Sequence, residues 1–413
     1  MKNCIRHILL GLIILVGCIQ GQNKISASDF YDDRLSNIDS FFCDKVNNKQ
    51  LAGAVSLIAK DNKIQYLKSF GYLDIEKSLP ISNDVIIPIG SMTKVITAIA
   101  VLKLYEDGKF LLNDPIEKYI PELKNLKVLI NSDSLLTEDV KSKPTIRDFL
   151  CHTSGMVYFG GRTVTDKLYR EAGFRTWDKS LQEFVKKVSE IPLAYQPGER
   201  WKYSYSYDVL GYLVEVISGM PFNQFCKERI FDPLGLKDTD FYIPKDKSDR
   251  LSNLYIYDNG ELKIDDSRDS SKYNQLPVAV SGGGGWSDSY GGIVTTISEF
   301  YIISNMLLNY GIYDSKRILS RKTVELMITN HIGNLRGNGK GYGLGVGVIT
   351  SIGEYGEIGS NNDVHWAGGP YNTFFWIDYN EKLIGILFTN TAPFGHLDMM
   401  SKFKILTLQA IND

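Results

Sequence analysis

Strand-forming sequence is concentrated near the two ends of this 413-residue chain, and this separation constrains the fold more than any other feature. Near the beginning, two apolar runs at 53–59 and 64–70 flank a short polar turn, which is typical of a β-hairpin. Runs of strand character return at 341–349, 371–378 and 382–389, and helical patterns cover 30–47 and 397–411. This order predicts an α+β fold in which one antiparallel sheet, built from both chain ends, is flanked by helices.

A long, mainly helical and loop-rich section separates the two strand regions. We expect residues 30–115 and 285–413 to form a discontinuous α/β sheet domain, with residues 116–284 as a mainly helical inserted region. The chain is 43% hydrophobic, which is enough for one large core or two intimately joined domains. Its formal net charge is −2 and its Lys and Arg residues are scattered, so nucleic acid is not an expected partner.

The first residues have the pattern of a secretory leader. Lys2 and Arg6 precede an apolar run at 8–16, which ends at a glycine and a cysteine. This run is too short to span a bilayer as a helix, and it is typical of the apolar part of a signal peptide. We therefore expect residues 1–17 to be a signal peptide and leave them out of the fold prediction.

The end of this leader resembles the lipobox of bacterial lipoproteins. The sequence Leu-Val-Gly-Cys at 15–18 has its pattern, in which the cysteine is lipidated and becomes the mature N-terminus. The resemblance implies that Cys18 carries the lipid, that residues 18–29 form a tether, and that the membrane is a partner. The protein would then be an extracytoplasmic, membrane-anchored lipoprotein of a bacterium, on the periplasmic or cell-surface side. An ordinary signal peptide is the alternative.

Ser91 stands between a strand-like run that breaks at Gly90 and a helical run whose apolar residues recur with a period of 3.6. At a helix N-terminus, free backbone N–H groups and the positive end of the dipole favour a developing oxyanion. Lys94 lies one turn further on the same face, where a desolvated lysine can act as a base. The same four residues also fit an N-cap serine followed by an exposed lysine.

Tyr203 lies in a segment that combines a turn, several aromatic residues and a helix. The turn is at Pro197-Gly198, and the buried stripe predicted for the following helix is Leu210, Leu213, Val214 and Ile217. Tyr203 would thus be held on a loop directly before a packed helix, and a phenol that moves protons needs such a fixed position. The alternative is a core tyrosine whose hydroxyl is satisfied.

Two further segments suggest other chemistry at first sight. His152 and Ser154 could belong to a Ser–His hydrolase, but we interpret this segment as a hydrogen-bonded corner at a helix end. The glycine-rich run 281–286 lacks the Gly-Lys-Ser/Thr of a phosphate-binding loop, and we expect a close backbone approach beside a pocket. The cysteines show no zinc-ligand spacing. We expect neither a metal nor a cofactor.

Three separated segments match one protein family in the same order. They are Ser-Met-Thr-Lys at 91–94, Tyr-Ser-Tyr at 203–205, and His-Trp-Ala-Gly-Gly at 365–369. Over roughly residues 30 to 410 the chain resembles the serine β-lactamase-like hydrolases, in the branch that joins class C β-lactamases, D-alanyl-D-alanine carboxypeptidases and family VIII esterases. Ser-x-x-Lys is the nucleophile motif of such penicillin-recognising enzymes. The resemblance implies the β-lactamase/transpeptidase-like fold.

The resemblance also implies a role for each matching residue. Ser91 would be the acylated nucleophile, while Lys94 and Tyr203 share the work of general base and acid, since a lysine beside a phenol favours the phenolate. The backbone N–H groups of Ser91 and Gly369 would form the oxyanion hole. The substrate would be contacted by Tyr205, Trp366, Ala367 and Gly368.

The chain departs from the β-lactamase pattern at two positions that recognise substrate. That pattern has Tyr-x-Asn and Lys-Thr-Gly, whereas this chain has Tyr205 in place of the asparagine and Trp366 in place of the lysine. The first change removes an amide for a β-lactam side-chain carbonyl, and the second removes a cation for a substrate carboxylate. An aromatic wall suits an uncharged ester or acyl group, and the esterase branch has a similar Trp-Gly-Gly.

The leading hypothesis is therefore an extracytoplasmic serine hydrolase that cleaves a carboxylic ester or a related acyl bond through an acyl-enzyme. One alternative is a β-lactamase or D-alanyl-D-alanine carboxypeptidase that acts on β-lactams or peptidoglycan peptides. The other is a catalytically silent lipoprotein that binds ligands in the same pocket. The expected partner is a small-molecule ester, β-lactam or peptide substrate, and the sequence leaves the oligomeric state open.

Overall fold

The computed structural model describes residues 29–158, 160–174, 179–266, 273, 280–285 and 292–412. The predicted signal peptide, Cys18 and nearly all of the predicted tether lie outside these residues. Among the described helices, none combines the length and the apolar composition needed to cross a bilayer.

The secondary structure follows the predicted order of helix, strands, helical section, strands and helix. The first part contains α1 (Asp32–Asn47), β1 (Gly53–Lys60), β2 (Lys63–Asp74), β3 (Leu79–Pro80), β4 (Ile87–Pro88), the 3₁₀ turn η1 (Gly90–Met92) and α2 (Thr93–Glu106). The middle contains β5 (Lys127–Leu129), β6 (Thr137–Asp139), α3 (Ile146–Leu150), α4 (Val164–Glu171), α5 (Leu181–Val188), α6 (Ser206–Ser218), α7 (Phe222–Cys226), α8 (Asp232–Leu234), β7 (Tyr255–Asp258) and β8 (Glu261–Ile264). The last part contains β9 (Val294–Thr295), α9 (Ile297–Leu308), β10 (Ile312–Tyr313), β11 (Lys316–Arg317), α10 (Arg321–Met327), β12 (Lys340–Tyr342), β13 (Gly347–Ile349), α11 (Ile352–Tyr355), β14 (Val364–Gly368), β15 (Thr373–Asp378), β16 (Leu383–Thr389), β17 (Thr391–Ala392) and α12 (Met399–Leu408).

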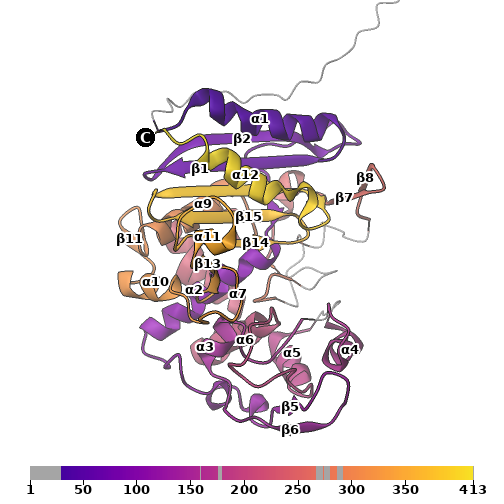
Figure 1. Cartoon of the computed structure of the whole chain (residues 1–413), viewed down its shortest axis with the longest axis vertical. Helices are drawn as coiled ribbons and strands as arrows, with labels where there is room; N and C mark the ends of the chain where they lie inside the picture. The colour runs from indigo at the N-terminus through magenta and orange to yellow at the C-terminus, as the bar shows by residue number, and fades with distance from the viewer. Residues whose placement is uncertain are drawn as a thin grey trace, which may run out of the picture.

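The main sheet joins the two ends of the chain, as predicted. Within the described residues it has eight strands in the order β12-β13-β14-β15-β16-β1-β2-β3. β1 and β2 form the predicted hairpin, with Asp61 and Asn62 in the left-handed conformation that a tight turn requires (φ 49° and 66°). β1 also pairs antiparallel with β16, so that Leu57 lies opposite Ile386. An early strand and a late strand are thus neighbours (Figure 1).

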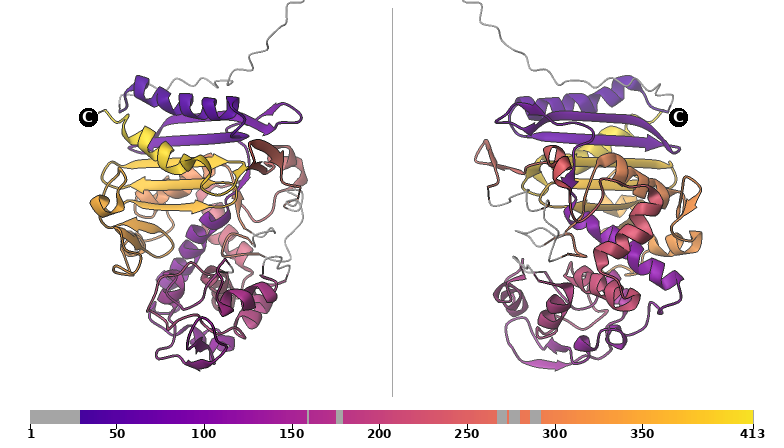
Figure 2. Two further views of the ribbon diagram at one scale, coloured as in Figure 1. Left: turned by 45° about the vertical axis from the view of Figure 1, so that its right-hand side comes forward. Right: turned by 180° about the vertical axis from the view of Figure 1, so that it is seen from behind.

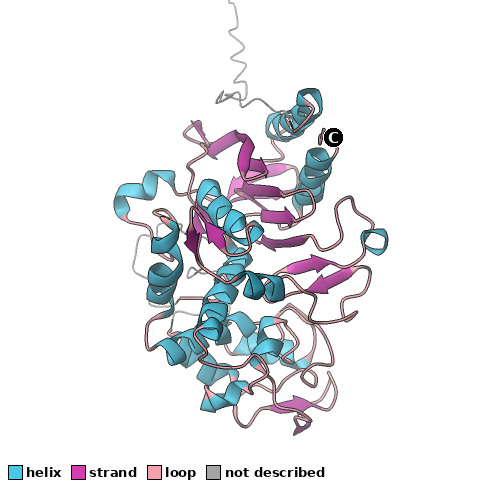
Figure 3. Cartoon of the chain, turned by 90° about the vertical axis from the view of Figure 1, so that its left-hand side faces the viewer, coloured by secondary structure: helices cyan, strands magenta, loops and turns pink. Residues whose placement is uncertain are grey.

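Alternating side chains give the sheet two apolar faces, because successive residues of a strand point to opposite sides. Along β1, Ala54 and Ile58 pack in a cluster with residues of α1 and α12. Val55 and Leu57 belong to the larger cluster on the other face, where α9 packs. The helices therefore cover both faces of the sheet (Figure 3).

One predicted strand is divided in the structure. The run 341–349 was expected to be continuous, but it forms β12 and β13, which pair with each other across a turn. The turn contains Gly345 at φ +96°, and Leu344 within it donates its backbone N–H to Met327 of α10 at 2.8 Å. The prediction of a single strand is wrong because glycines permit the turn and a distant helix end holds it.

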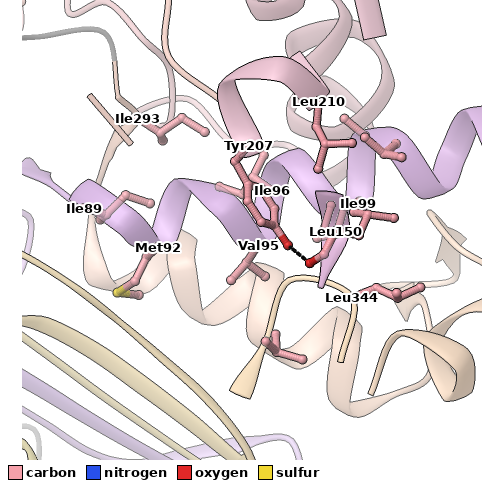
Figure 4. Close-up of a cluster of buried hydrophobic side chains, with 14 of the residues drawn as sticks. Ile89, Met92, Val95, Ile96, Ile99, Leu150, Tyr207, Leu210, Ile293 and Leu344 are labelled. Carbon is pink, nitrogen blue, oxygen red and sulfur yellow. Dashed lines mark hydrogen bonds between the residues drawn. The ribbon is translucent and has the colours of Figure 1, made fainter. Parts of the chain in front are cut away.

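The mainly helical section packs beneath the sheet (Figures 1 and 2), and its apolar side chains join the same large cluster as the sheet residues. The division at 116–284 into a separate region stays a prediction. Most residues of α2 are buried, including Lys94. Figure 4 shows the apolar surroundings of α2, with Met92, Val95, Ile96 and Ile99 beside Ile89, Leu150, Tyr207, Leu210, Ile293 and Leu344. This packing fixes the helix that begins two residues after Ser91, at Thr93.

Candidate active site

The structure brings together the three residues that the sequence suggests for proton transfer and nucleophilic attack. Ser91 lies in the 3₁₀ turn η1, directly before α2, and its Oγ is 2.5 Å from the Tyr203 hydroxyl. Lys94 Nζ donates to the same Oγ at 3.3 Å and lies 4.6 Å from the centre of the Tyr203 ring. A serine hydroxyl between a phenol and an amine is placed to lose its proton as it attacks.

Lys94 is buried, and its side chain contacts a backbone carbonyl as well as Ser91 and Tyr203. Its exposed fraction is 2%, and its ammonium donates to the backbone carbonyl of Gly283. Its Nζ also lies 6.0 Å from the centre of the Tyr207 ring. A buried ammonium needs such partners, because an unsatisfied charge in the protein interior is costly. Gly283 could not be predicted as a partner of Lys94, because a residue of any type can supply a backbone carbonyl.

The glycine-rich run makes the close backbone approach that the sequence predicted for it. A Cβ atom on Gly282 would lie 2.1 Å from the carbonyl oxygen of Tyr207, and one on Gly284 would lie 2.1 Å from that of Gly90. These distances leave no room for a side chain. Residues 282–284 therefore pass close to the backbone of α6 and of the turn that carries Ser91.

The segment containing His152 is a hydrogen-bonded corner, as predicted. His152 bonds to both residues that flank Tyr203 in the sequence, Lys202 and Ser204. The His152 carbonyl accepts from the backbone N–H of Lys202 at 3.0 Å, and Nδ1 lies 2.9 Å from Ser204 Oγ. Ser206 Oγ then contacts both Ser204 Oγ, at 2.8 Å, and Ser154 Oγ, at 2.9 Å. Burial lowers the pKa of His152 well below its usual range, with Lys94 adding to the effect.

The segment predicted to supply the second oxyanion donor lies beside Ser91. A Cβ atom on Gly368, at the end of β14, would fall 1.9 Å from the carbonyl oxygen of Ile89. Gly90 has φ +49°, and a Cβ atom on it would lie 2.3 Å from the carbonyl oxygen and 3.4 Å from the nitrogen of Gly369. Glycines at 90 and 368 thus allow β14 to approach the nucleophile turn, while the role of Gly369 as a donor stays a prediction.

Comparison with known proteins assigns the chain to a family. The family model described as Beta-lactamase matches residues 38–407. The chain belongs to the beta-lactamase family. It is a serine hydrolase, and the predicted β-lactamase/transpeptidase-like α+β fold is confirmed.

Three similar proteins illustrate the range of the family. Protein Rv1367c of Mycobacterium tuberculosis is 29% identical over 358 residues, which cover 83% of this chain and 86% of that protein. Esterase EstB of Burkholderia gladioli is 32% identical over 209 residues, covering 50% of this chain and 51% of the esterase. The solved structure of EstCE1, a hydrolase with promiscuous acyltransferase activity, has a TM-score of 0.77 at 23% identity and covers 92% of this chain and 98% of its own.

Trp366 and Ala367 of this beta-lactamase family member lie on β14 and are half-buried. The Trp366 ring centre is 6.1 Å from that of Tyr203 and 5.2 Å from that of Tyr342. Trp366 therefore stands next to Tyr203, where the related β-lactamase pattern has a lysine. Tyr342 was not predicted as a neighbour of the site, because its position depends on the turn between β12 and β13.

Tyr205 does not lie where a substrate-binding residue is expected. Its side chain is only 1% exposed, and its ring centre is 4.4 Å from Tyr158 and 5.4 Å from Tyr169 in stacked arrangements. Burial raises the pKa of its phenol. Tyr158, whose ring centre lies 5.5 Å from Tyr203, stands between Tyr205 and the catalytic groups. The buried Tyr205 ring thus contacts Tyr158, which in turn contacts Tyr203.

No group of three or more His, Cys, Asp or Glu side chains that could hold a metal ion occurs in the part of the chain that the structure describes.

Proposed function

We propose that this protein cleaves a carboxylic ester or a related acyl bond through an acyl-enzyme on Ser91, outside the cytoplasm and anchored through a lipid on Cys18. The observation that carries the proposal is the contact of Ser91 Oγ with the Tyr203 hydroxyl at 2.5 Å and with Lys94 Nζ at 3.3 Å. A hydroxyl between these two groups matches the arrangement of an activated nucleophile with its base.

In the acylation step, Ser91 Oγ attacks the carbonyl carbon of the ester and its proton passes to Tyr203, which acts as a phenolate beside the Lys94 ammonium. The carbonyl oxygen becomes an oxyanion that accepts from the backbone N–H groups of Ser91 and Gly369. When this intermediate collapses, the bond to the alcohol oxygen breaks and Tyr203 returns the proton to the leaving alkoxide.

Deacylation repeats these steps with water as the nucleophile. Tyr203 takes a proton from the water as it attacks the acyl carbon, and the second oxyanion is held in the same place. The bond to Ser91 Oγ breaks, and the proton on Tyr203 passes to that oxygen. The carboxylic acid leaves and the starting enzyme is restored.

An ester is favoured over a β-lactam by what surrounds these groups. Trp366 lies beside Tyr203 where the β-lactamase pattern has a lysine, so this position offers no cation to a substrate carboxylate. Tyr205 is buried, so the position of the pattern's asparagine offers no amide to a β-lactam side chain. Similarity to a protein named as an esterase, EstB, supports the same choice.

A fluorophosphonate probe tests the nucleophile. The wild-type protein should be labelled, and Ser91→Ala should not be labelled. Ser40→Ala, an exposed serine on α1, is the matched control and should be labelled like wild type. Equal labelling of Ser91→Ala and wild type would contradict the assignment of the nucleophile.

A panel of short-chain p-nitrophenyl esters, nitrocefin and D-alanine esters tests the substrate class. The proposal predicts turnover of the simple esters above the other substrates. Stable labelling of Ser91 by a fluorescent penicillin, without ester turnover, would instead favour action on β-lactams or peptidoglycan peptides. A wild-type protein that is folded and reacts with none of these reagents would indicate a binding protein without catalysis.

Tyr203→Phe tests the proton-transfer role. The substitution keeps the ring and removes the hydroxyl, so kcat for the best ester should fall at least about 10²-fold, the low end for general acid–base catalysis. Tyr310→Phe, at a tyrosine that is 36% exposed, serves as the control for loss of a phenol. Near-normal turnover by Tyr203→Phe would refute the assigned role.

A further inference from the structure

A buried carboxylate on α6 lies close to the catalytic lysine and has no part in the acyl-transfer steps. Asp208 is in the first turn of α6 and is only 3% exposed. Its Oδ1 accepts from Ser281 Oγ at 2.6 Å and from the backbone N–H of Gly283 at 3.1 Å. The carbonyl of the same Gly283 accepts from Lys94 Nζ. A single residue, Gly283, thus connects Asp208 with Lys94.

The backbone strip 281–283 is held from two helices at once. On the side of α6, Asp208 accepts from the strip as described, and a Cβ atom on Gly283 would lie 2.6 Å from Asp208 Oδ2. On the side of α2, Thr97 Oγ1 donates to the carbonyl oxygen of Gly282 at 2.7 Å. The strip is therefore wedged between the helix that carries Lys94 and the helix that follows Tyr203.

Burying the Asp208 carboxylate in the protein interior costs desolvation free energy. Burial raises the pKa of Asp208 to about 6, while Ser281 and Lys94 act in the opposite direction. The two hydrogen bonds that Asp208 accepts from Ser281 and Gly283 offset part of this desolvation cost.

We propose that Asp208 is a positioning residue for the acylation reaction: it holds the strip 281–283 so that the Gly283 carbonyl points at Lys94 and keeps Nζ beside Ser91 Oγ. This inference rests on the proposed function of Ser91. It adds no chemical step, since Asp208 acts through Gly283 and contacts neither substrate nor the reacting atoms.

The donors of Lys94 explain why the Gly283 carbonyl matters. An ammonium has three N–H donors on a flexible stem. In this site one donor is directed at Ser91 Oγ and another at the Gly283 carbonyl, and the Tyr203 ring lies close by. If the carbonyl moves, Nζ loses a fixed partner and can leave Ser91. A displacement of about 1 Å at a catalytic group costs about 10²-fold in rate.

Three variants separate this role from a structural one. Asp208→Ala removes the acceptor, Asp208→Asn keeps one acceptor oxygen, and Ser281→Ala removes the side-chain tether of the strip. Asp208→Ala should lose about 10- to 100-fold in kcat for a p-nitrophenyl ester while KM stays within about twofold, as for a misplaced catalytic group. Asp208→Asn should return to within about threefold of wild type, because the acceptor is restored.

Glu215→Ala is the matched control on the same helix. Glu215 is a half-buried carboxylate on α6 whose oxygen accepts from the backbone N–H of Phe222 at 3.0 Å. Its loss should leave kcat unchanged. The thermal midpoint of each variant is measured alongside, so that kinetic and structural effects are seen separately.

A folded Asp208→Ala protein with wild-type kcat would overturn the inference, as would an Asp208→Asn protein as slow as Asp208→Ala. If Asp208→Ala does not fold, Ser281→Ala decides: a lower kcat at unchanged KM supports the inference, and wild-type kcat overturns it. The proposed function fails separately, because in that case the wild-type protein itself is not labelled at Ser91 by a fluorophosphonate.

Discussion

Lys94 makes the central contacts of the proposed active site. It is almost fully buried, and it joins the nucleophile, the Gly283 carbonyl and the Tyr203 ring. Its position one turn after Ser91 was predictable from spacing along a helix. Its contact with Gly283 was not predictable, because a backbone carbonyl leaves no mark in the sequence.

Lys94→Met should slow acylation by at least about 10²-fold, because methionine keeps the volume but donates no proton and carries no charge. Lys103→Met is a close control. Lys103 lies on the same helix, is half-buried, and donates to a backbone carbonyl, that of Ile318, at 2.8 Å. Rates of labelling by a fluorophosphonate measure both variants. Labelling of Lys94→Met at the rate of Lys103→Met would contradict the role of Lys94.

His365, on β14 beside Trp366, gives a prediction about stability and pH. Burial lowers the pKa of His365 to about 3, and the Lys404 charge adds to this effect. In the unfolded chain a histidine has a pKa of about 6.5, so below that pH the unfolded chain binds a proton that the folded protein does not. The contribution of His365 to stability is therefore complete above about pH 6.5 and is lost as the pH falls towards about 3.

The difference between His365→Gln and wild type isolates this effect. The free energy of unfolding of the variant should fall less steeply than that of wild type between about pH 6.5 and 4, because glutamine does not titrate. Urea unfolding at several pH values measures both slopes. Identical slopes for the two proteins would contradict the prediction.

At the scale of elements, the corner after α3 fixes the loop that carries Tyr203. His152 bonds to Lys202 and to Ser204, the residues on either side of Tyr203. The sequence predicted a corner and a rigid loop as separate features. Their contact depends on the packing of α3 against α6, which no local pattern encodes.

His152→Ala should lower kcat by about tenfold or more without a matching change in KM, because Tyr203 loses one of its two anchors. His152→Asn should recover part of the loss. Asparagine tolerates the left-handed backbone at this position, where φ is 58°, and its amide can reach a hydroxyl. Steady-state kinetics with a p-nitrophenyl ester measure both variants. Wild-type kcat in folded His152→Ala would show that the corner is not needed for catalysis.

Two features differ from the predictions, and tertiary contacts cause both differences. The run 341–349 folds back at Gly345 because a backbone contact from Leu344 to Met327 holds the turn. Tyr205 is buried because aromatic residues from α4 and its surroundings pack against it. In both cases tertiary contacts decide the outcome, although the strand at 341–349 was predicted from a local pattern and the role of Tyr205 from the family resemblance.

At the scale of the whole molecule, the sheet is completed only when the two ends of the chain meet. The strand-forming runs were evident from their composition, but the pairing of β1 with β16 is a long-range contact. The order of the elements along the chain predicted one sheet built from both ends, but it did not specify which strands pair. The proposed active site also depends on long-range contacts, since Ser91, Tyr203 and Gly369 come from three distant segments.

The lipid anchor is a prediction about the whole molecule in its cell. In a bacterium that processes lipoproteins, the wild-type protein should sediment with membranes, because a lipidated cysteine supplies membrane affinity. Cys18→Ala should lose the lipid and appear in the soluble fraction. Metabolic labelling with a radioactive fatty acid provides the direct readout. Equal membrane association of both proteins would contradict lipidation at Cys18.

The central claim is that Ser91 becomes acylated during ester turnover. The most direct measurement is to mix the protein with p-nitrophenyl acetate, quench with acid within the first turnovers, and map the peptides by mass spectrometry. The account predicts one acetyl group on the peptide that contains Ser91, reduced strongly in Lys94→Met and absent in Ser91→Ala. An acetyl group on another residue in a protein that hydrolyses the ester, or hydrolysis that continues unchanged in Ser91→Ala, would contradict it.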